Sequence, residues 1–411
     1  MDRLPTELID RIVYDVESFS DYNGSHICSL RELDNWPASH NISRQAQRAL
    51  AVLRLVDKAF CRSASRALFR YITIRRDLGP TFLPWFEALA SSEYALYVRC
   101  ITFELRPMSR ERLRYVQLPE EVANRLPSLL PKFENLKSIH IWPFGGDRQE
   151  KTITMVAPIL NSIANLPLHN LTELGLMVGG TPYLHDLFGE LNHDTPVTQL
   201  AQRIQNLHVI GDLNNMTGLN VLLKSTPNLC SLTIEGSWLT TKRLVHRKIT
   251  FGQTTPPLRF LDLAEIKISS NHLLALLEEC KGSLRFLSLK AIELTAGSWM
   301  HILSQINKNL NLYMFLLTYD EPEEKEEEHW DLKEKLGLFH WLDEFKITWC
   351  VHGDIQRQVS ANRLVAGLGP LSNAMMDEYL SRPSLKSAML EKDYQLLMSR
   401  SWDFEKHQNQ W

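Results

Sequence analysis

Residues 258–289, LRFLDLAEIKISSNHLLALLEECKGSLRFLSL, decide the fold of this chain. The stretch opens on an apolar-x-x-apolar-x-apolar pattern at Leu258, Leu261 and Leu263. The last two of these positions lie two residues apart, which is the period of a strand with one buried face. Residues 269–283 follow as a helix pattern with a serine at its start and a glycine near its end. The first pattern then begins again, so the stretch is one complete strand–helix unit.

Eight copies of the six-residue pattern occur between residues 98 and 317. Their first positions are 25 to 38 residues apart, and the later spacings fall near the roughly 20–29 residues of a leucine-rich repeat. Each unit can bury its apolar face only against its neighbours. We therefore predict an α/β fold, a curved leucine-rich-repeat solenoid of about eight to nine irregular strand–helix units, with an ordinary α/β sheet as the alternative. The units begin at Val98, Leu136, Leu171, Ile204, Leu229, Leu258, Leu284 and Leu312.

Helix patterns fill most intervals between the predicted strands. They cover residues 118–133, 152–166, 269–283 and 295–309, whereas residues 237–257 have poor helix periodicity and are expected to form an irregular loop. No unit carries a clear asparagine ladder three residues after the sixth position of the pattern. The repeats are therefore degenerate.

The third, fifth and seventh positions of each unit point away from the solenoid core, towards the concave surface. Four apolar side chains at these positions are expected to be exposed and to anchor a protein target. Two alternatives stay open: the C-terminal segment covers them, or the strand phase is displaced by one residue. Phe260 and Phe286 should be cross-strand neighbours. The four candidate anchors are Trp142, Met177, Phe260 and Phe286.

The repeat region is predicted to span residues 76–352 and to be capped at both ends, because a terminal repeat otherwise exposes an apolar face. A last strand is expected at residues 345–351, followed by a helical C-terminal cap at 353–411. The run EPEEKEEEHW marks an acidic loop at about 320–330. Such runs are usually solvated, and an acidic docking segment is the alternative.

Residues 1–75 are predicted to form a separate helical unit. Pro5 suits the first turn of a helix because its φ is fixed and it has no N–H to lose. Glu7 lies where the helix dipole favours an acid. A second helical patch covers residues 49–74. A unit of this size has only a marginal core, so we expect it to pack on something else. The first helix has one apolar face, made by Leu4, Leu8, Ile9, Ile12 and Val13.

These two helical patches resemble the F-box family. The first half of the family motif matches at Leu4, Pro5, Glu7, Leu8 and Ile12, and the second half at Leu53, Val56, Lys58, Phe60, Leu68 and Phe69. With repeats behind them, the chain resembles the F-box/leucine-rich-repeat proteins, particularly the divergent fungal ones. It departs from the family in one respect, since an insertion at about residues 20–47 separates the two halves. A long surface loop costs little additional entropy.

The resemblance implies a substrate-recognition subunit of an SCF (Skp1–cullin–F-box) ubiquitin ligase. In this family the N-terminal helices bind the adaptor Skp1, and through it a cullin, while the repeats bind the protein to be ubiquitinated. Such a subunit is not itself an enzyme. The alternative is a non-catalytic leucine-rich-repeat scaffold with a helical cap and no role in ubiquitination. The implied adaptor-binding residues are Leu4, Pro5, Glu7, Leu8, Ile12, Leu53, Val56, Lys58 and Phe60.

Composition and motifs argue against other classes of protein. The 45 Lys and Arg against 48 Asp and Glu give a net charge of −3, which does not support binding to nucleic acid or a membrane surface. No apolar run approaches the roughly 20 residues of a membrane span, and the N-terminus lacks a leader pattern, so we expect a cytoplasmic or nuclear protein. The six cysteines form no CxxC pair, and the phosphate-loop, dinucleotide, hydrolase and zinc-protease motifs are missing. We therefore expect no metal, cofactor or catalytic residue.

Overall fold

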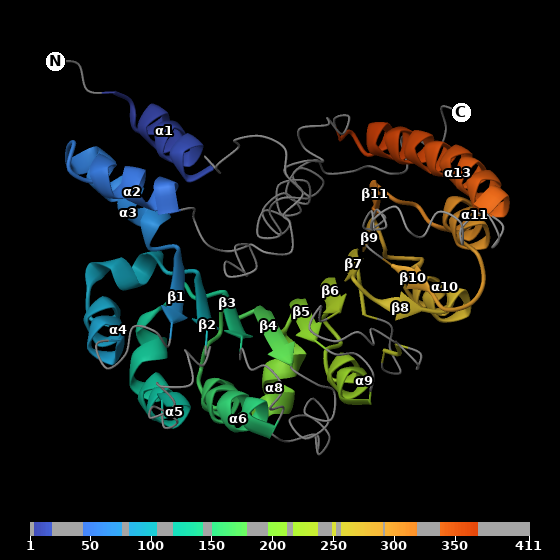
Figure 1. Ribbon diagram of the computed structural model, residues 1–411. Coiled ribbons are helices and arrows are strands. Elements are labelled where there is room, and N and C mark those ends of the chain that lie inside the picture. Colours follow the sequence, from blue (N-terminus) through green and yellow to red (C-terminus); the bar gives the residue numbers. More distant parts are fainter. Residues whose placement is uncertain are drawn as a thin grey trace, which may run out of the picture. The chain divides into compact units, whose positions relative to one another are not determined.

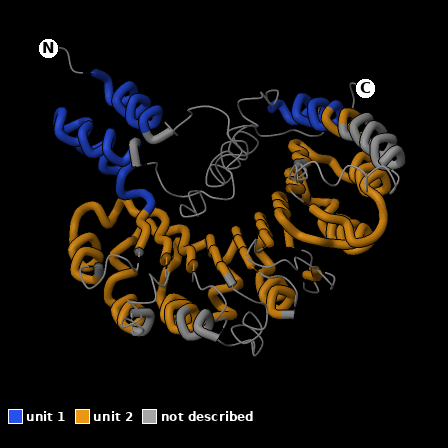
Figure 2. Tube along the Cα trace, in the orientation of Figure 1, with its two compact units in different colours: residues 1–71, 357–411 blue, residues 72–356 orange. Residues whose placement is uncertain are grey.

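The computed structural model describes residues 4–18, 44–75, 82–104, 118–142, 150–178, 196–211, 217–236, 249–251, 256–290, 292–318 and 338–368. The chain divides into two compact units, drawn in blue and orange in Figure 2. One unit comprises residues 1–71 together with 357–411, and the other comprises residues 72–356. The sequence placed these divisions after residues 75 and 352.

The larger unit is an α/β structure built on a parallel sheet (Figure 1). Nine strands of the described residues form this sheet in sequence order, and every neighbouring pair from β2 to β11 is parallel. Two short strands, β8 (Lys267–Ile268) and β10 (Glu293–Leu294), pair separately. The nine strands are β1 (Tyr71–Arg75), β2 (Cys100–Glu104), β3 (Ser138–Trp142), β4 (Glu173–Val178), β5 (Asn206–Gly211), β6 (Ser231–Gly236), β7 (Phe260–Ala264), β9 (Phe286–Lys290) and β11 (Met314–Thr318).

All eight strands predicted from the repeated pattern are confirmed. The register aligns the same pattern position on each neighbour, as for Leu261 on β7 and Leu287 on β9. The fourth and sixth positions of the pattern are buried throughout, except Leu317, which is half-buried on the edge strand β11. These positions form the apolar core of the sheet.

Helices α4 to α11 connect the strands and lie along one side of the sheet (Figure 1). The four helices predicted at 118–133, 152–166, 269–283 and 295–309 are confirmed. The last two begin at serine caps, since Ser269 and Ser298 each accept a hydrogen bond from a backbone N–H three residues on. The helical segments are α4 (Phe82–Ala90), η4 (Glu93–Tyr97), α5 (Leu118–Leu129), η6 (Leu130–Lys132), α6 (Glu150–Ala164), α8 (Pro196–Arg203), α9 (Thr217–Lys224), α10 (Ser270–Cys280) and α11 (Trp299–Asn309).

A ladder of asparagine side chains links consecutive units. Each asparagine directly precedes the first apolar position of its unit and donates to a backbone carbonyl of the unit before it. The repeats therefore do carry an asparagine ladder, but before the first apolar position rather than after the sixth. Its members are Asn135 (to Leu96), Asn170 (to Glu134) and Asn228 (to Gln202), each with an Nδ2–O distance of 2.8 Å.

Replacing the three ladder asparagines together by alanine is expected to lower the free energy of unfolding by about 3 kcal/mol, because each net hydrogen bond contributes about 1 kcal/mol. Urea unfolding of the full chain measures the loss. Asn309→Ala is the matched control, since Asn309 Nδ2 bonds the side chain of Gln305 in its own helix and not a neighbouring unit. A triple variant as stable as Asn309→Ala would show that the ladder does not stabilise the repeats.

The smaller unit contains three packed helices, α1 (Thr6–Ser18), α2 (Arg44–Leu53) and α3 (Lys58–Leu68). Helix α3 begins after Asp57, whose Oδ1 accepts hydrogen bonds from the backbone N–H of Ala59 at 2.7 Å and of Phe60 at 2.9 Å. Ser63 donates to Asp10 Oδ1 at 2.6 Å and ties α3 to α1. The helices share one core, made by Ile9, Val13, Ala46, Leu50, Phe60, Ala64 and Ala67.

The strand predicted at residues 345–351 is wrong, because these residues lie within α13 (Leu338–Val365). The apolar residues there fit two periods at once. Phe345, Ile347 and Trp349 alternate as in a strand, whereas Leu338, Leu342 and Phe345 follow helical spacing. The longer helical pattern determines the structure, and Ile355 and Val359 continue it as buried positions four residues apart.

Four predicted segments lie wholly or partly outside the described residues. Of the insertion at 20–47, only residues 44–47 are described, and they form the first turn of α2. The acidic loop at 320–330 and the C-terminal cap beyond residue 368 lie outside them, as does most of the loop at 237–257.

Candidate functional site

Helix α1 divides its apolar residues between two faces. Ile9 and Val13 are buried in the core of the three helices. Leu8 and Ile12 lie four residues apart on the outer side of α1, Leu4 precedes the helix by two residues, and Leu8 is 50% exposed. The apolar face predicted for this helix is therefore wide. One side of it packs into the core, and the other side is exposed.

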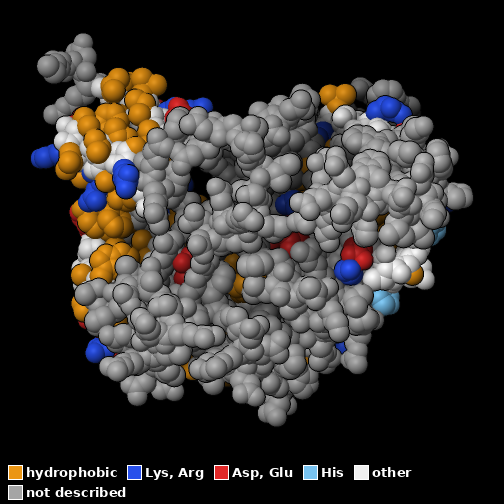
Figure 3. Space-filling model, viewed as in Figure 1, with side chains coloured by type: hydrophobic (Ala, Val, Ile, Leu, Met, Phe, Trp, Pro, Cys, Tyr) orange, Lys and Arg blue, Asp and Glu red, His pale blue; other side chains and the backbone are white. Residues whose placement is uncertain are grey.

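A second exposed apolar group lies where α2 ends. Val52, Leu55 and Val56 are all exposed, and Leu55 is 85% exposed. The chain turns here, with the Leu55 N–H donating to Val52 O and the Val56 N–H to Leu53 O. We call Leu4, Leu8, Ile12, Val52, Leu55 and Val56 the apolar surface; Figure 3 shows hydrophobic side chains gathered over α1 and α2 at the upper left.

Sequence reasoning identified four of the six residues of the apolar surface. It missed Val52 and Leu55, although one signal was present. Leu50 and Leu53 are enough to cover the inner side of α2, so the additional apolar residues nearby had to point elsewhere.

The other predicted adaptor-binding residues lie around this surface, with one exception. Pro5, Glu7 and Lys58 are exposed, and Leu53 is partly buried against the core. The exception is Phe60, which is buried among the three helices. Phe60 therefore cannot be part of the exposed surface, because the cap at Asp57 starts α3 in a phase that turns this ring inward.

The larger unit carries a second set of candidate residues on one face of its sheet. This face holds the third, fifth and seventh positions of the repeated pattern, whereas the fourth and sixth positions lie on the other face. The strand register aligns the third, fifth and seventh positions of neighbouring units into three rows that cross the sheet. As predicted, Phe260 lies opposite Phe286. The middle row contains several polar side chains, and we call the three rows together the polar face. The middle row runs Thr102, His140, Gly175, His208, Thr233, Asp262, Ser288 and Leu316.

The expected exposure of the four candidate anchors on this face is wrong. Trp142 is 2% exposed, and Met177, Phe260 and Phe286 are also buried. Parallel sheets are usually covered on both faces, so alternation along a strand does not imply solvent on the second face. Neighbouring side chains contribute to the burial, since the Trp142 ring stacks on His140 with centroids 5.9 Å apart. A role of the four residues in binding stays a prediction.

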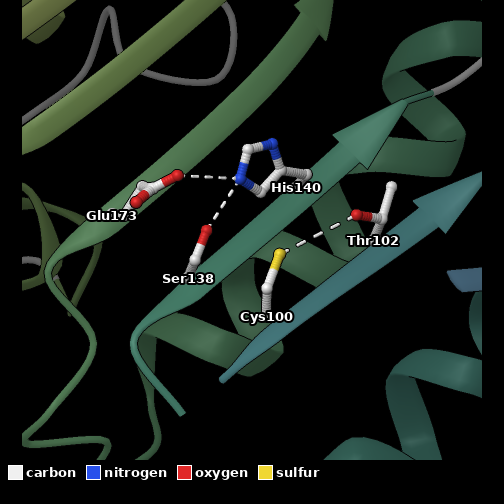
Figure 4. Close-up of polar contacts among 5 residues, drawn as sticks. All are labelled: Cys100, Thr102, Ser138, His140 and Glu173. Carbon is white, nitrogen blue, oxygen red and sulfur yellow. Dashed lines mark hydrogen bonds and ion pairs between the residues drawn. The ribbon is translucent and has the colours of Figure 1, made fainter. Parts of the chain in front are cut away.

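His140 lies at the centre of a buried polar cluster (Figure 4). Its Nε2 is 2.7 Å from Ser138 Oγ and 3.1 Å from Glu173 Oε1. Figure 4 shows these side chains on the same side of the sheet as Cys100 and Thr102 of the neighbouring strand. Burial by itself lowers the pKa of His140, but charge interactions and hydrogen bonds with Cys100 and Glu173 outweigh it and raise the pKa to about 10.

The cluster does not have the geometry of a catalytic triad. A triad needs the hydroxyl and the carboxylate on opposite nitrogens of the imidazole. Here Ser138 and Glu173 both bond to Nε2, so Glu173 competes with the serine instead of orienting the ring for it. His140 is also fully buried. Sequence reasoning missed this cluster because members on different strands are 33 or more residues apart in the chain. Only members of the same strand, such as Ser138 and His140, are close in sequence.

No family model matches this sequence, and no curated protein matches it. Within the described residues, no three His, Cys, Asp or Glu side chains are grouped to hold a metal ion. None of the helices described is both long and apolar enough to cross a membrane.

Proposed function

We propose that this protein is a substrate-recognition subunit of an SCF-type ubiquitin ligase. The apolar surface would bind a Skp1-like adaptor, and through it a cullin, and the repeat region would bind a protein target. The observation that carries the proposal is the exposed row of Leu8 and Ile12 on α1, with Leu4 just before the helix, while Ile9 and Val13 of the same helix are buried in the core. Leu4, Leu8 and Ile12 are positions of the first half of the F-box motif.

Physical chemistry supports a partner at this surface. Contiguous exposed apolar side chains are characteristic of interaction sites, and depletion of charge at the centre of a patch is typical of an interface core. Glu7 on α1 and Lys58 at the start of α3 are exposed and would lie at the rim. The Asp57 cap and the bond from Ser63 to Asp10 hold the three helices together, so the surface is formed before a partner binds.

The repeat region supports the second half of the proposal. The nine strands of the large sheet lie side by side in sequence order, and an asparagine of one unit bonds the backbone of the unit before. We interpret this arrangement as a degenerate leucine-rich-repeat solenoid, a class that uses extended surfaces to bind other proteins.

Binding to purified Skp1 tests the proposal directly. The full-length chain is mixed with recombinant Skp1 and analysed by size-exclusion chromatography with light scattering, and then with a Skp1–cullin complex. We expect a one-to-one complex with Skp1 that also retains the cullin. Absence of a complex with a correctly folded chain would reject the ligase role and favour the scaffold without a role in ubiquitination.

A further inference from the structure

Strand β11 lies at one end of the nine-stranded sheet. Among the strands that the structure describes, it pairs with β9 alone, and the pair is parallel. In a parallel ladder the backbone groups of successive residues point alternately to the two sides of the strand. The Met314 N–H donates to Arg285 O at 3.2 Å, so the even-numbered residues of β11 bond to β9. The backbone groups of Phe315 and Leu317 therefore point away from β9, to what we call the outer edge.

The composition of β11 favours strand pairing along such an edge. Residues 312–318, LYMFLLT, contain no charge, no proline and no glycine. An apolar strand of this kind at the end of a sheet is a template for a strand of another chain. A second copy of this protein carries the same strand with the same outer edge. Two copies of β11 can therefore pair in antiparallel orientation about a two-fold axis.

Helix α13 places a hydrogen-bond donor at the outer edge. Gln356 Nε2 donates to Phe315 O at 2.8 Å, although the two residues are 41 positions apart in the chain. In the register, Phe315 aligns with Leu287 of β9. Carbonyls at this register position point to the next strand of the sheet, as Arg285 O does two residues before Leu287. The side-chain amide of Gln356 therefore donates where the N–H of a further strand would donate.

Burial makes this hydrogen bond consequential. Phe315 is 0% exposed, so its carbonyl oxygen has lost its contact with solvent. Gln356 is half-buried, and the adjacent Ile355 is buried. A buried carbonyl that loses its donor costs more free energy than an average hydrogen bond contributes. Where the sequence predicted a last strand at 345–351, the chain forms a helix, and this helix supplies the donor through one side chain.

We propose that Gln356 closes the outer edge of β11 against strand pairing with a second copy of this chain. While its amide donates to Phe315 O, the edge is closed and the protein is monomeric. When the amide is removed, the edge opens, and the β11 strands of two copies pair. The proposal does not rest on the ligase function.

The size of the effect follows from the number of edges that must open. Removing the donor from a buried carbonyl should raise the fraction of open edge by about tenfold. A dimer needs one open edge in each copy, so its apparent dissociation constant contains this factor twice. The dissociation constant should therefore fall by about a hundredfold.

Sedimentation velocity of the full-length protein, over a range of concentrations, tests the proposal. The wild type should be monomeric, whereas Gln356→Glu should dimerise because a carboxylate cannot donate to Phe315 O. Gln358→Glu is the matched control. It makes the same charge change on the same helix, but two residues away, more than half a turn around the axis, and it should stay monomeric. Gln356→Ala, which adds no charge, should dimerise as well.

Two further measurements locate the contact. Leu317→Pro removes an N–H that points away from β9, and proline is tolerated at such positions of an edge strand. The double variant Gln356→Glu/Leu317→Pro should therefore be monomeric. Independently of this variant, hydrogen exchange of residues 312–318 in Gln356→Glu should slow as the protein concentration rises.

Three results would overturn the proposal. The first is association of the wild type as strong as that of Gln356→Glu. The second is a folded Gln356→Glu and a folded Gln356→Ala that both remain monomeric, with circular dichroism as the check of folding. The third is a Gln356→Glu dimer whose exchange at residues 312–318 does not depend on concentration, since that dimer would use another surface.

Discussion

Replacing Leu8 by aspartate is expected to weaken binding to Skp1 at least about 30-fold, which corresponds to about 2 kcal/mol. Leu8 lies on the outer side of α1, between Leu4 and Ile12 in the sequence, and is half exposed. In a complex its side chain would be desolvated at the centre of the interface, where a carboxylate has no partner. Ile12→Asp should have the same effect for the same reason. Isothermal titration calorimetry with purified Skp1 measures both losses.

The variant chain should remain folded, because Leu8 does not belong to the core that Ile9 and Val13 form. Circular dichroism and thermal unfolding check this expectation. The matched control is Leu96→Asp, since Leu96 is 45% exposed, in the larger unit. It should bind Skp1 as the wild type does. Equal affinity of Leu8→Asp and the wild type would mean that the outer row of α1 is not the adaptor-binding surface.

Periodicity along the chain was enough to predict the eight strands from β2 to β11 and the helices between several of them. It succeeded because a buried parallel strand and an amphipathic helix have different spacings of apolar residues. Strand β1 was missed, because Tyr71, Ile72 and Ile74 were assigned to the helical patch predicted at 49–74, and the last four residues of that patch are too few to show a strand period; that end of the predicted patch is wrong. In α13 the apolar residues fit both a strand period and a helix period, and this led to the wrong prediction of a strand at 345–351.

Features that depend on partners distant in the sequence could not be predicted. Alternation in a strand assigns residues to a face, but it does not say what covers that face, and so Trp142 was expected to be exposed. A single histidine has no recognisable motif, and only the parallel register brings His140 next to Glu173. The asparagine ladder was missed for the same reason, since the carbonyl that Asn170 contacts belongs to the preceding unit.

Gly236 illustrates a constraint that the sequence alone does not reveal. This glycine ends β6, beside the bend at Glu265 that follows β7. A Cβ atom at position 236 would lie 2.0 Å from the carbonyl oxygen of Glu265 and 2.9 Å from its carbonyl carbon. Glu265 has little freedom to move away, because its φ of 54° already lies in the left-handed region and its N–H donates to Lys290 O at 2.9 Å.

Replacing Gly236 by alanine is therefore expected to lower the free energy of unfolding by about 3 kcal/mol, because backbone atoms must shift to accept the methyl group. The midpoint of urea unfolding measures the loss. Gly282→Ala provides the matched control, since a Cβ there would meet no atom within 4 Å, and its stability should change by no more than about 0.5 kcal/mol. If both variants were equally stable, the contact between the end of β6 and the Glu265 bend would not constrain the repeat region.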